Sequence, residues 1–253
     1  MRASWGVPIL PILLLACAGE PPPAPTTSST AAPAAAAPRV PAPPGASGPR
    51  NLAMGTGEPR EPQTFTLGQR LRDAVERGDR ATIEKALERG ADLQEKDDLG
   101  RTVVLLATHF AGDLDLVKLL HAKGAPVDIP DVNGRTALSF AAEDGRLDLV
   151  RWLVEQRAEI HRRDQAGRTA LFHAALNARD DVIGFLADRG AAVDARDQFG
   201  DTPLMVACAK SLDATAALLV ARGADPKLKD QEGRTASERA GAGAERCRKL
   251  GTS

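Results

Sequence analysis

The sequence predicts a mainly α-helical repeat solenoid, and two observations carry that prediction. A Gly-X-Thr phrase returns every 33 or 34 residues, beginning at Gly100, Gly134, Gly167, Gly200 and Gly233. Such a period is typical of stacked units that each contribute one supersecondary element. Aromatic residues make up 3% of the chain and Tyr is absent. The core therefore consists of Leu, Val, Ile and Ala, which favours packed helices over sheets.

The first helix of each unit begins at the Thr of this phrase. A Thr hydroxyl can accept a hydrogen bond from the first turn of a helix and so cap its N-terminus. Pro203, directly after Thr202, suits the first helical position, where a missing N–H costs nothing. A small residue that lets neighbouring helices approach closely follows five positions after each Thr, at Ala107, Ala141, Ala174, Ala207 and Ala240.

A second apolar set indicates a second helix in each full unit. Leu149, Val150 and Leu153, for example, have the spacing of one helix face. A Gly can end such a helix in the left-handed conformation. Three units place one there, at Gly124, Gly190 and Gly223. Each unit is therefore a helix–turn–helix followed by a short polar segment.

The two ends of the array differ from its middle. Residues 67–96 have the length and apolar spacing of a unit but lack the opening phrase, so we expect an N-terminal cap there. Full repeats begin at residues 97, 131, 164 and 197. The register from residue 230 has no room for a complete second helix, and Gly241 and Gly243 weaken its first helix. We expect a frayed C-terminal cap.

The opening phrase resembles that of the ankyrin repeat. Gly-Arg-Thr-Ala-Leu at residues 134–138 and Gly-Asp-Thr-Pro-Leu at residues 200–204 carry the resemblance, which covers residues 67 to about 250 of a domain spanning residues 64–253. It implies that each polar segment is a β-hairpin finger at right angles to the helix pair. It also implies that the repeated aspartates order the hairpin turns rather than bind calcium. These are Asp97, Asp131, Asp164, Asp197 and Asp230.

Three departures from the ankyrin pattern have structural consequences. One extra residue lies between His109 and Gly112 and predicts a bulged turn. Arg157 stands where other units place the helix-ending Gly, so that turn is either strained by about 1 kcal/mol or rearranged. The family carries a His, part of a hydrogen-bond network, three residues after the Thr. We expect packing to replace that network, because the residues there are Leu105, Ser139, Phe172, Met205 and Glu238.

The amino terminus predicts export and lipid attachment. The apolar run from Val7 to Ala16 is too short to span a bilayer, which takes about 20 residues as a helix, and is typical of a signal peptide over residues 1–16. Leu14-Leu15-Ala16-Cys17 resembles the lipobox of bacterial lipoproteins, which implies cleavage before an acylated Cys17. Ala18 rather than Asp after that cysteine implies the outer membrane, facing the periplasm. An ordinary signal peptide that contains a Cys is the alternative.

The composition of residues 17–63 predicts a disordered linker. Twelve of the 18 prolines lie between Pro21 and Pro62, among Ala, Ser, Thr and Gly. Such a segment cannot bury enough apolar surface to offset its ordering entropy. We interpret it as a stalk between the lipid and the repeats.

The reactive residues do not indicate an enzyme, and we expect no cofactor and no metal. The histidines are His109, His121, His161 and His173, with no pair four residues apart, and neither a phosphate-binding loop nor a nucleophile elbow occurs. Cys208 replaces a small core residue and is expected as a buried thiol, with a disulfide to Cys247 as the alternative in an oxidising compartment. Lys plus Arg number 33 against 34 Asp plus Glu, which argues against nucleic-acid binding by bulk electrostatics.

What remains is a surface for a protein partner. In the ankyrin family, partners dock in the concave groove formed by the fingers and inner helices, and the resemblance places 16 residues of this chain there. The apolar ones are the strongest candidates, because a fingertip has no core to fill; Phe199 could instead cover its own hairpin, and each Arg could be merely solvated. The candidates are Leu99, Arg101, Val132, Asn133, Arg135, Gln165, Arg168, Gln198, Phe199, Asp201, Gln231 and Arg234 on the fingers, and His109, Phe110, Glu143 and Asp144 on the inner helices.

The sequence therefore predicts a membrane-tethered periplasmic scaffold that binds a protein without catalysing a reaction. One alternative is a structural envelope protein that binds cell-wall polymer, which would need aromatic platforms along the groove. The other is an enzyme with an unrecognised site, which would need a convergent cluster such as His109, Glu143 and Asp144.

Overall fold

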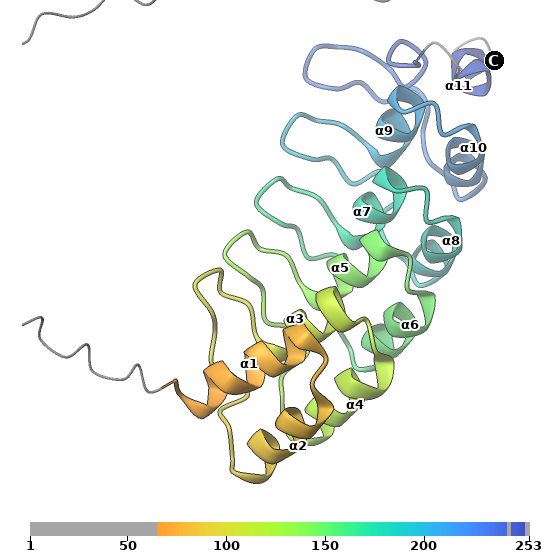
Figure 1. Cartoon of the computed structure of the whole chain (residues 1–253). Helices are drawn as coiled ribbons and strands as arrows, with labels where there is room; N and C mark the ends of the chain where they lie inside the picture. The colour runs from red at the N-terminus through yellow and green to blue at the C-terminus, as the bar shows by residue number, and fades with distance from the viewer. Residues whose placement is uncertain (1–64, 242–243, 251–253) are drawn as a thin grey trace, which may run out of the picture. The chain divides into compact units, whose positions relative to one another are not determined.

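A computed structural model of the chain describes residues 65–241 and 244–250 (Figure 1). The predicted signal peptide, Cys17 and the predicted linker lie outside the described residues. The helices are α1 (Leu67–Arg77), α2 (Arg80–Glu88), α3 (Val103–Leu106), η1 (Ala107–Ala111), α4 (Leu114–Ala122), α5 (Ala137–Asp144), α6 (Leu147–Glu155), α7 (Ala170–Leu176), α8 (Asp180–Asp188), α9 (Pro203–Ala209), α10 (Asp213–Ala221) and α11 (Glu245–Lys249).

The helices stack in two rows, as the period predicts. An inner row contains α1, α3 with η1, α5, α7 and α9, and an outer row contains α2, α4, α6, α8 and α10. The finger loops all project to one side, away from the outer row (Figure 1). We call the surface formed by the finger loops and the inner row the finger face, and the surface of the outer row the outer face. The prediction of a mainly α-helical solenoid is confirmed.

The predicted hydroxyl caps are present at Thr136, Thr169 and Thr202, whereas Thr102 begins α3 without a side-chain capping hydrogen bond. The Thr169 hydroxyl accepts a hydrogen bond from the backbone N–H of Phe172 at 3.3 Å, and Pro203 is the first residue of α9. Phe172, at the position of the family's His, is fully buried. Packing therefore replaces the family's hydrogen-bond network at this position, and Leu105 and Met205 are buried in the same way.

The fingers are tight turns rather than regular hairpins, because the described residues contain no β-strand. In the second finger the backbone N–H of Asp131 donates to the Arg135 carbonyl at 2.9 Å. The Asp131 carboxylate accepts from the backbone N–H groups of Asn133 and Arg135, each at 2.8 Å. The aspartate thus orders the turn, as predicted. Gly134 has φ 78°, and a Cβ there would lie 3.1 Å from the Asp164 Cα of the next finger, so only glycine suits this stacking.

The extra residue near His109 is accommodated in a π-helical turn. Helix α3 continues directly into η1, where each backbone hydrogen bond spans one residue more than in an α-helix. Gly112 ends the turn at φ 54°. The sequence predicts a bulge here, and the π-turn is its form. At the other departure, Arg157 adopts φ 65°. The left-handed conformation is therefore retained without glycine, and the turn is strained rather than rearranged.

The C-terminal register is more ordered than the sequence predicts. Residues around Ser237 form turns instead of a first helix, as the glycines suggest, but the short helix α11 follows and packs against α10. Cys247 of α11 is bonded to Cys208 of α9, and both are fully buried. The expectation of a buried thiol at Cys208 is therefore wrong, and the alternative, a disulfide, is present. Sequence spacing alone could not decide this, because α11 was not foreseen.

Candidate protein-binding surface

Hydrogen bonds between successive fingers join them into one continuous surface. The backbone N–H of Val132 donates to the Leu99 carbonyl at 2.9 Å, and that of Gln231 donates to the Phe199 carbonyl at 3.2 Å. Gln165 adds a side-chain bond, with Nε2 donating to the Val132 carbonyl at 2.6 Å. Each fingertip is therefore held by its neighbours and offers a fixed side chain to a partner.

Apolar side chains predicted at the fingertips are exposed. Leu99 and Val132 are each 50% exposed, and Phe199 is 55% exposed. Phe199 therefore does not fold back to bury itself against its own hairpin. Phe110, on the π-turn of the inner row, is 46% exposed. We call these four residues the apolar contacts. They do not fill a core, and they can therefore anchor a partner on the finger face.

An aromatic cluster underlies the N-terminal part of the finger face. The ring centroid of His109 lies 4.7 Å from that of Phe110 and 4.6 Å from that of Phe140. Arg135 Cζ lies 3.7 Å from the centroid of Phe140, and Arg101 Cζ lies 5.4 Å from that of Phe110. The π-turn thus places His109 and Phe110 between two finger arginines, in contacts typical of cation–π pairs.

The finger arginines have carboxylate partners within the protein, and the side chains of Arg101 and Arg135 are 18% and 22% exposed, whereas that of Arg234 is 45% exposed and largely solvated. Arg101 Nε lies 2.7 Å from Asp97, and Arg234 Nε lies 3.0 Å from Asp230. Arg135 pairs with Glu143. Arg168 lies 3.4 Å from Asp197. These ion pairs neutralise the face and stiffen the fingers, which leaves the apolar contacts as the groups free to bind.

The remaining predicted residues divide by exposure. Asn133, Gln165, Gln198 and Gln231 are exposed, and two of the glutamines bond the preceding finger. Asp201 differs from the other candidates, because it is buried and paired with Arg239 of the following register.

The three residues that an enzyme would need to converge have separate partners. His109 stacks on two phenyl rings, Glu143 pairs with Arg135, and Asp144 Oδ2 lies 3.5 Å from Arg146 Nε. A general acid–base pair requires hydrogen-bond reach between the groups. Each of the three side chains is therefore engaged by a different partner.

Comparison with known proteins identifies the repeats. The sequence pattern of the family described as ankyrin repeats (3 copies) matches residues 71–164 and 158–230. The chain belongs to the ankyrin-repeat family. Proteins built from such repeats generally act as scaffolds that bind other proteins, with partners docked on the stacked surface.

Similar proteins cover only part of this ankyrin chain. M-phase phosphoprotein 8 of Homo sapiens is 45% identical over 75 residues, which is 29% of this chain and 9% of that protein. The proteins of the same name from Rattus norvegicus and Mus musculus are 44% identical over 75 residues. The chain spans about a tenth of the length of these relatives, at 9% of each.

Two structural clusters of the ankyrin domain escaped sequence reasoning. His173 Nε2 lies 2.8 Å from Asp164 Oδ2, with both side chains nearly buried. Burial works to raise the pKa of Asp164, but hydrogen bonds from His173 and from the Arg168 backbone outweigh it and lower the pKa. The sequence held one signal of this pair, because His173 lies one residue after the position at which the family carries its His. The second cluster, around Arg239, is described below.

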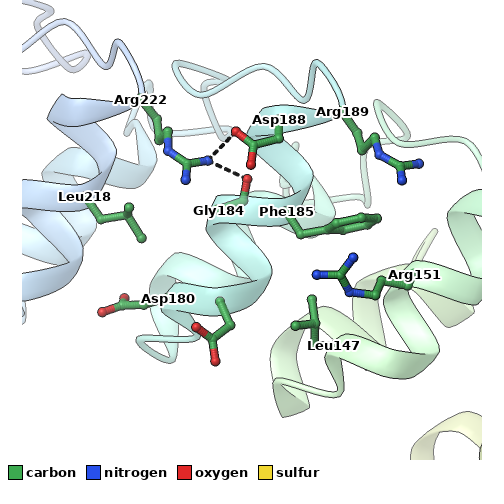
Figure 2. A pocket seen from close by; sticks show the side chains of 10 residues that line it. Leu147, Arg151, Asp180, Gly184, Phe185, Asp188, Arg189, Leu218 and Arg222 are labelled. Atoms are coloured by element: carbon green, nitrogen blue, oxygen red, sulfur yellow. Dashed lines mark hydrogen bonds and ion pairs between the residues drawn. The ribbon is translucent and has the colours of Figure 1, made fainter.

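A cavity of 630 Å³ lies on the outer face of the ankyrin domain, between α6, α8 and α10 (Figure 2). The Phe185 ring lies between Arg151 and Arg189, whose Cζ atoms are each 4.7 Å from its centroid. Arg222 Nη1 donates to the Gly184 carbonyl and to Asp188, both at 2.6 Å. These contacts hold α8 between its neighbours, and we assign the cavity a structural role.

Within residues 65–241 and 244–250, no helix has both the length and the apolar content to cross a bilayer. The predicted lipid anchor at Cys17 lies outside this range.

Proposed function

We propose that this ankyrin domain is a non-enzymatic scaffold that binds a protein partner through its finger face while lipid on Cys17 holds it at a membrane. The observation that carries the binding proposal is the exposure of the apolar contacts on finger loops that hydrogen bonds fix in place. Burying a large apolar side chain contributes about 1.5–3 kcal/mol, and these residues are about half exposed. A few such anchors at one interface can supply most of its binding energy.

We do not expect the arginines of the finger face to attract a partner by their charge. Arg101 and Arg135 are already paired with carboxylates and stacked on rings. A partner that depended on their charge would have to displace those contacts. We therefore expect a partner segment with apolar side chains, and only a weak dependence of affinity on salt.

The compartment is part of the same proposal. The disulfide between Cys208 and Cys247 is typical of proteins in oxidising compartments, which supports an exported protein. Cys17 directly after Ala16 supports lipid attachment, and Ala18 supports the bacterial outer membrane, facing the periplasm. A tether raises the local concentration of the domain near membrane partners without any new contact.

The binding proposal is tested by crosslinked capture from intact cells. The full chain with Leu99→Asp and Val132→Asp is compared with wild type and with Leu119→Asp. Leu119 is 37% exposed on α4, so this control places one carboxylate on the outer face, against the two that the double variant places on the finger face. We expect a protein that wild type and Leu119→Asp capture and the double variant loses. Equal capture by all three, or capture of cell-wall fragments alone, would contradict the proposal.

The tether is tested separately with Cys17→Ala. The expected result is loss of acyl-label incorporation and release of the protein from the membrane fraction. Unchanged membrane retention would overturn the lipid anchor while leaving the binding proposal intact.

A further inference from the structure

The C-terminal cap, by which we mean residues 235–241 and 244–250, has little helix of its own. Its turns around Ser237 replace the usual inner helix, and α11 spans five residues. An isolated helix of that length is unstable in water. The cap therefore depends on its attachments to the preceding repeat.

Two side-chain attachments and one backbone hydrogen bond join the cap to that repeat. The first is the disulfide between Cys208 of α9 and Cys247 of α11, which bridges 39 residues and is fully buried at both cysteines. The second is Arg239, whose Nη1 pairs with Asp201 and lies 2.9 Å from Asp230 Oδ2. Gly241 adds a backbone hydrogen bond to the Cys208 carbonyl at 3.1 Å.

Arg239 connects the cap to the fourth finger, residues 197–201. Asp201 ends that finger, two residues after Phe199, and its backbone carbonyl accepts from the Asp197 N–H at 2.9 Å to close the turn. The Asp201 side chain is 9% exposed, and among the described residues Arg239 is its ion-pair partner. A buried carboxylate without its partner is strongly unfavourable. Loss of the cap would therefore destabilise the finger that presents Phe199.

We propose that the Cys208–Cys247 disulfide controls the C-terminal end of the finger face: with the bond formed, the cap stays docked, Arg239 holds Asp201, and Phe199 is presented for binding. With the bond open, the cap detaches and the fourth finger loosens, while the N-terminal fingers with Leu99 and Val132 are unaffected. This inference rests on the proposed function for its consequence in binding, but the coupling itself can be measured without a partner.

The chemistry of opening is thiol–disulfide exchange. A dithiol reductant supplies two electrons and two protons, Cys208 and Cys247 become thiols, and the reductant is oxidised to a disulfide. Closure is the reverse exchange with an oxidised dithiol. Because both sulfurs are buried, we expect the cap to open locally before either one reacts.

The test is amide hydrogen exchange on the full-length mature chain, comparing wild type with Cys208→Ala/Cys247→Ala. Ala is suited to position 208, because Ala142 and Ala175 fill the corresponding positions and are fully buried. We expect exchange in residues 197–201 to become faster by on the order of tenfold or more. The second finger, residues 131–135, is the internal control and should not change. Equal exchange of residues 197–201 in both proteins would overturn the proposal.

Arg239→Gln separates the two attachments. With the disulfide intact, exchange should rise in residues 197–201 while α11 stays protected. If residues 197–201 are unchanged in this variant, the coupling through Arg239 is wrong. Dithiothreitol should reproduce the effect of the double variant in wild type and add nothing in the double variant. Because these readouts need no partner, they remain decisive even if capture by the finger face fails.

Discussion

Arg239 Nη1 lies 2.9 Å from Asp230 Oδ2 and also pairs with Asp201, so one guanidinium joins two fingers. Asp201 stands where the four other registers carry Arg101, Arg135, Arg168 and Arg234. The charge reversal in the Gly-Asp-Thr phrase is thus matched by an arginine 38 residues further along the chain. The two changes form one structural unit that ties the C-terminal cap to the array.

The acid stability of the last finger should depend on Asp230. Burial works to raise its pKa, but hydrogen bonds from the Arg234 backbone and from the Arg234 and Arg239 side chains lower it from 3.8 to about 2. A carboxyl group whose pKa is lower in the folded state stabilises the fold at pH values above its unfolded-state pKa. This stabilisation is lost as the pH falls from about 4 to about 2. Asp230→Asn removes the charge and keeps an acceptor oxygen. We expect it to destabilise the domain at pH 7, with the difference from wild type vanishing near pH 2 in unfolding titrations.

Removing His173 should destabilise the domain, because it leaves the side chain of Asp164 without this partner. Their 2.8 Å contact is nearly shielded from water, and a buried polar group that loses its partner costs about 1–3 kcal/mol. We expect His173→Ala to lower the free energy of unfolding by that amount. In a double-mutant cycle with Asp164→Asn, the two effects should not add. Full additivity would mean that the pair contributes nothing specific.

Phe110 should matter for binding and little for stability. It is 46% exposed on the π-turn, and substitutions at such sites change stability by about 0.5 kcal/mol or less. Phe110→Ala should therefore unfold like wild type and capture less partner. Phe172→Ala is the contrasting variant: it empties a fully buried site and should cost about 3–5 kcal/mol. Undiminished capture by Phe110→Ala would remove Phe110 from the binding surface.

Arg157 marks a position where stability can be gained. Its φ of 65° is unfavourable for a residue with a Cβ. Arg157→Gly should raise the free energy of unfolding by about 0.5–1 kcal/mol after the entropy of glycine in the unfolded chain is included. Arg157→Ala keeps the strain and should give no gain. If both variants gain equally in thermal unfolding, the Arg side chain rather than the backbone is the cause.

The helix pairs could be predicted from the sequence because they follow from a period, and the period fixes where Thr136 caps and where Leu149 packs. The extra residue at η1 could be counted from the sequence, but the π-helical form that accommodates it could not. The fingertip residues were predictable, since Phe199 has no core to fill.

Contacts across repeats could not be predicted in the same way. The partners of Arg239 and of Cys247 are set by where a short, irregular cap docks, and no local pattern encodes that docking. The ion pairs of Arg101 with Glu76 of α1 and of Arg135 with Glu143 of α5 likewise required the relative placement of fingers and helices.

Site-specific photocrosslinking in intact cells distinguishes a partner bound to the finger face from a partner bound to the outer face. A photoreactive residue is placed at Val132, in the second finger, in one chain and at Leu119, on α4 of the outer row, in another, and both positions are exposed. We predict one discrete crosslinked protein from position 132 and none of that product from position 119. The same product from both positions, or from position 119 alone, would mean that the finger face is not the binding surface.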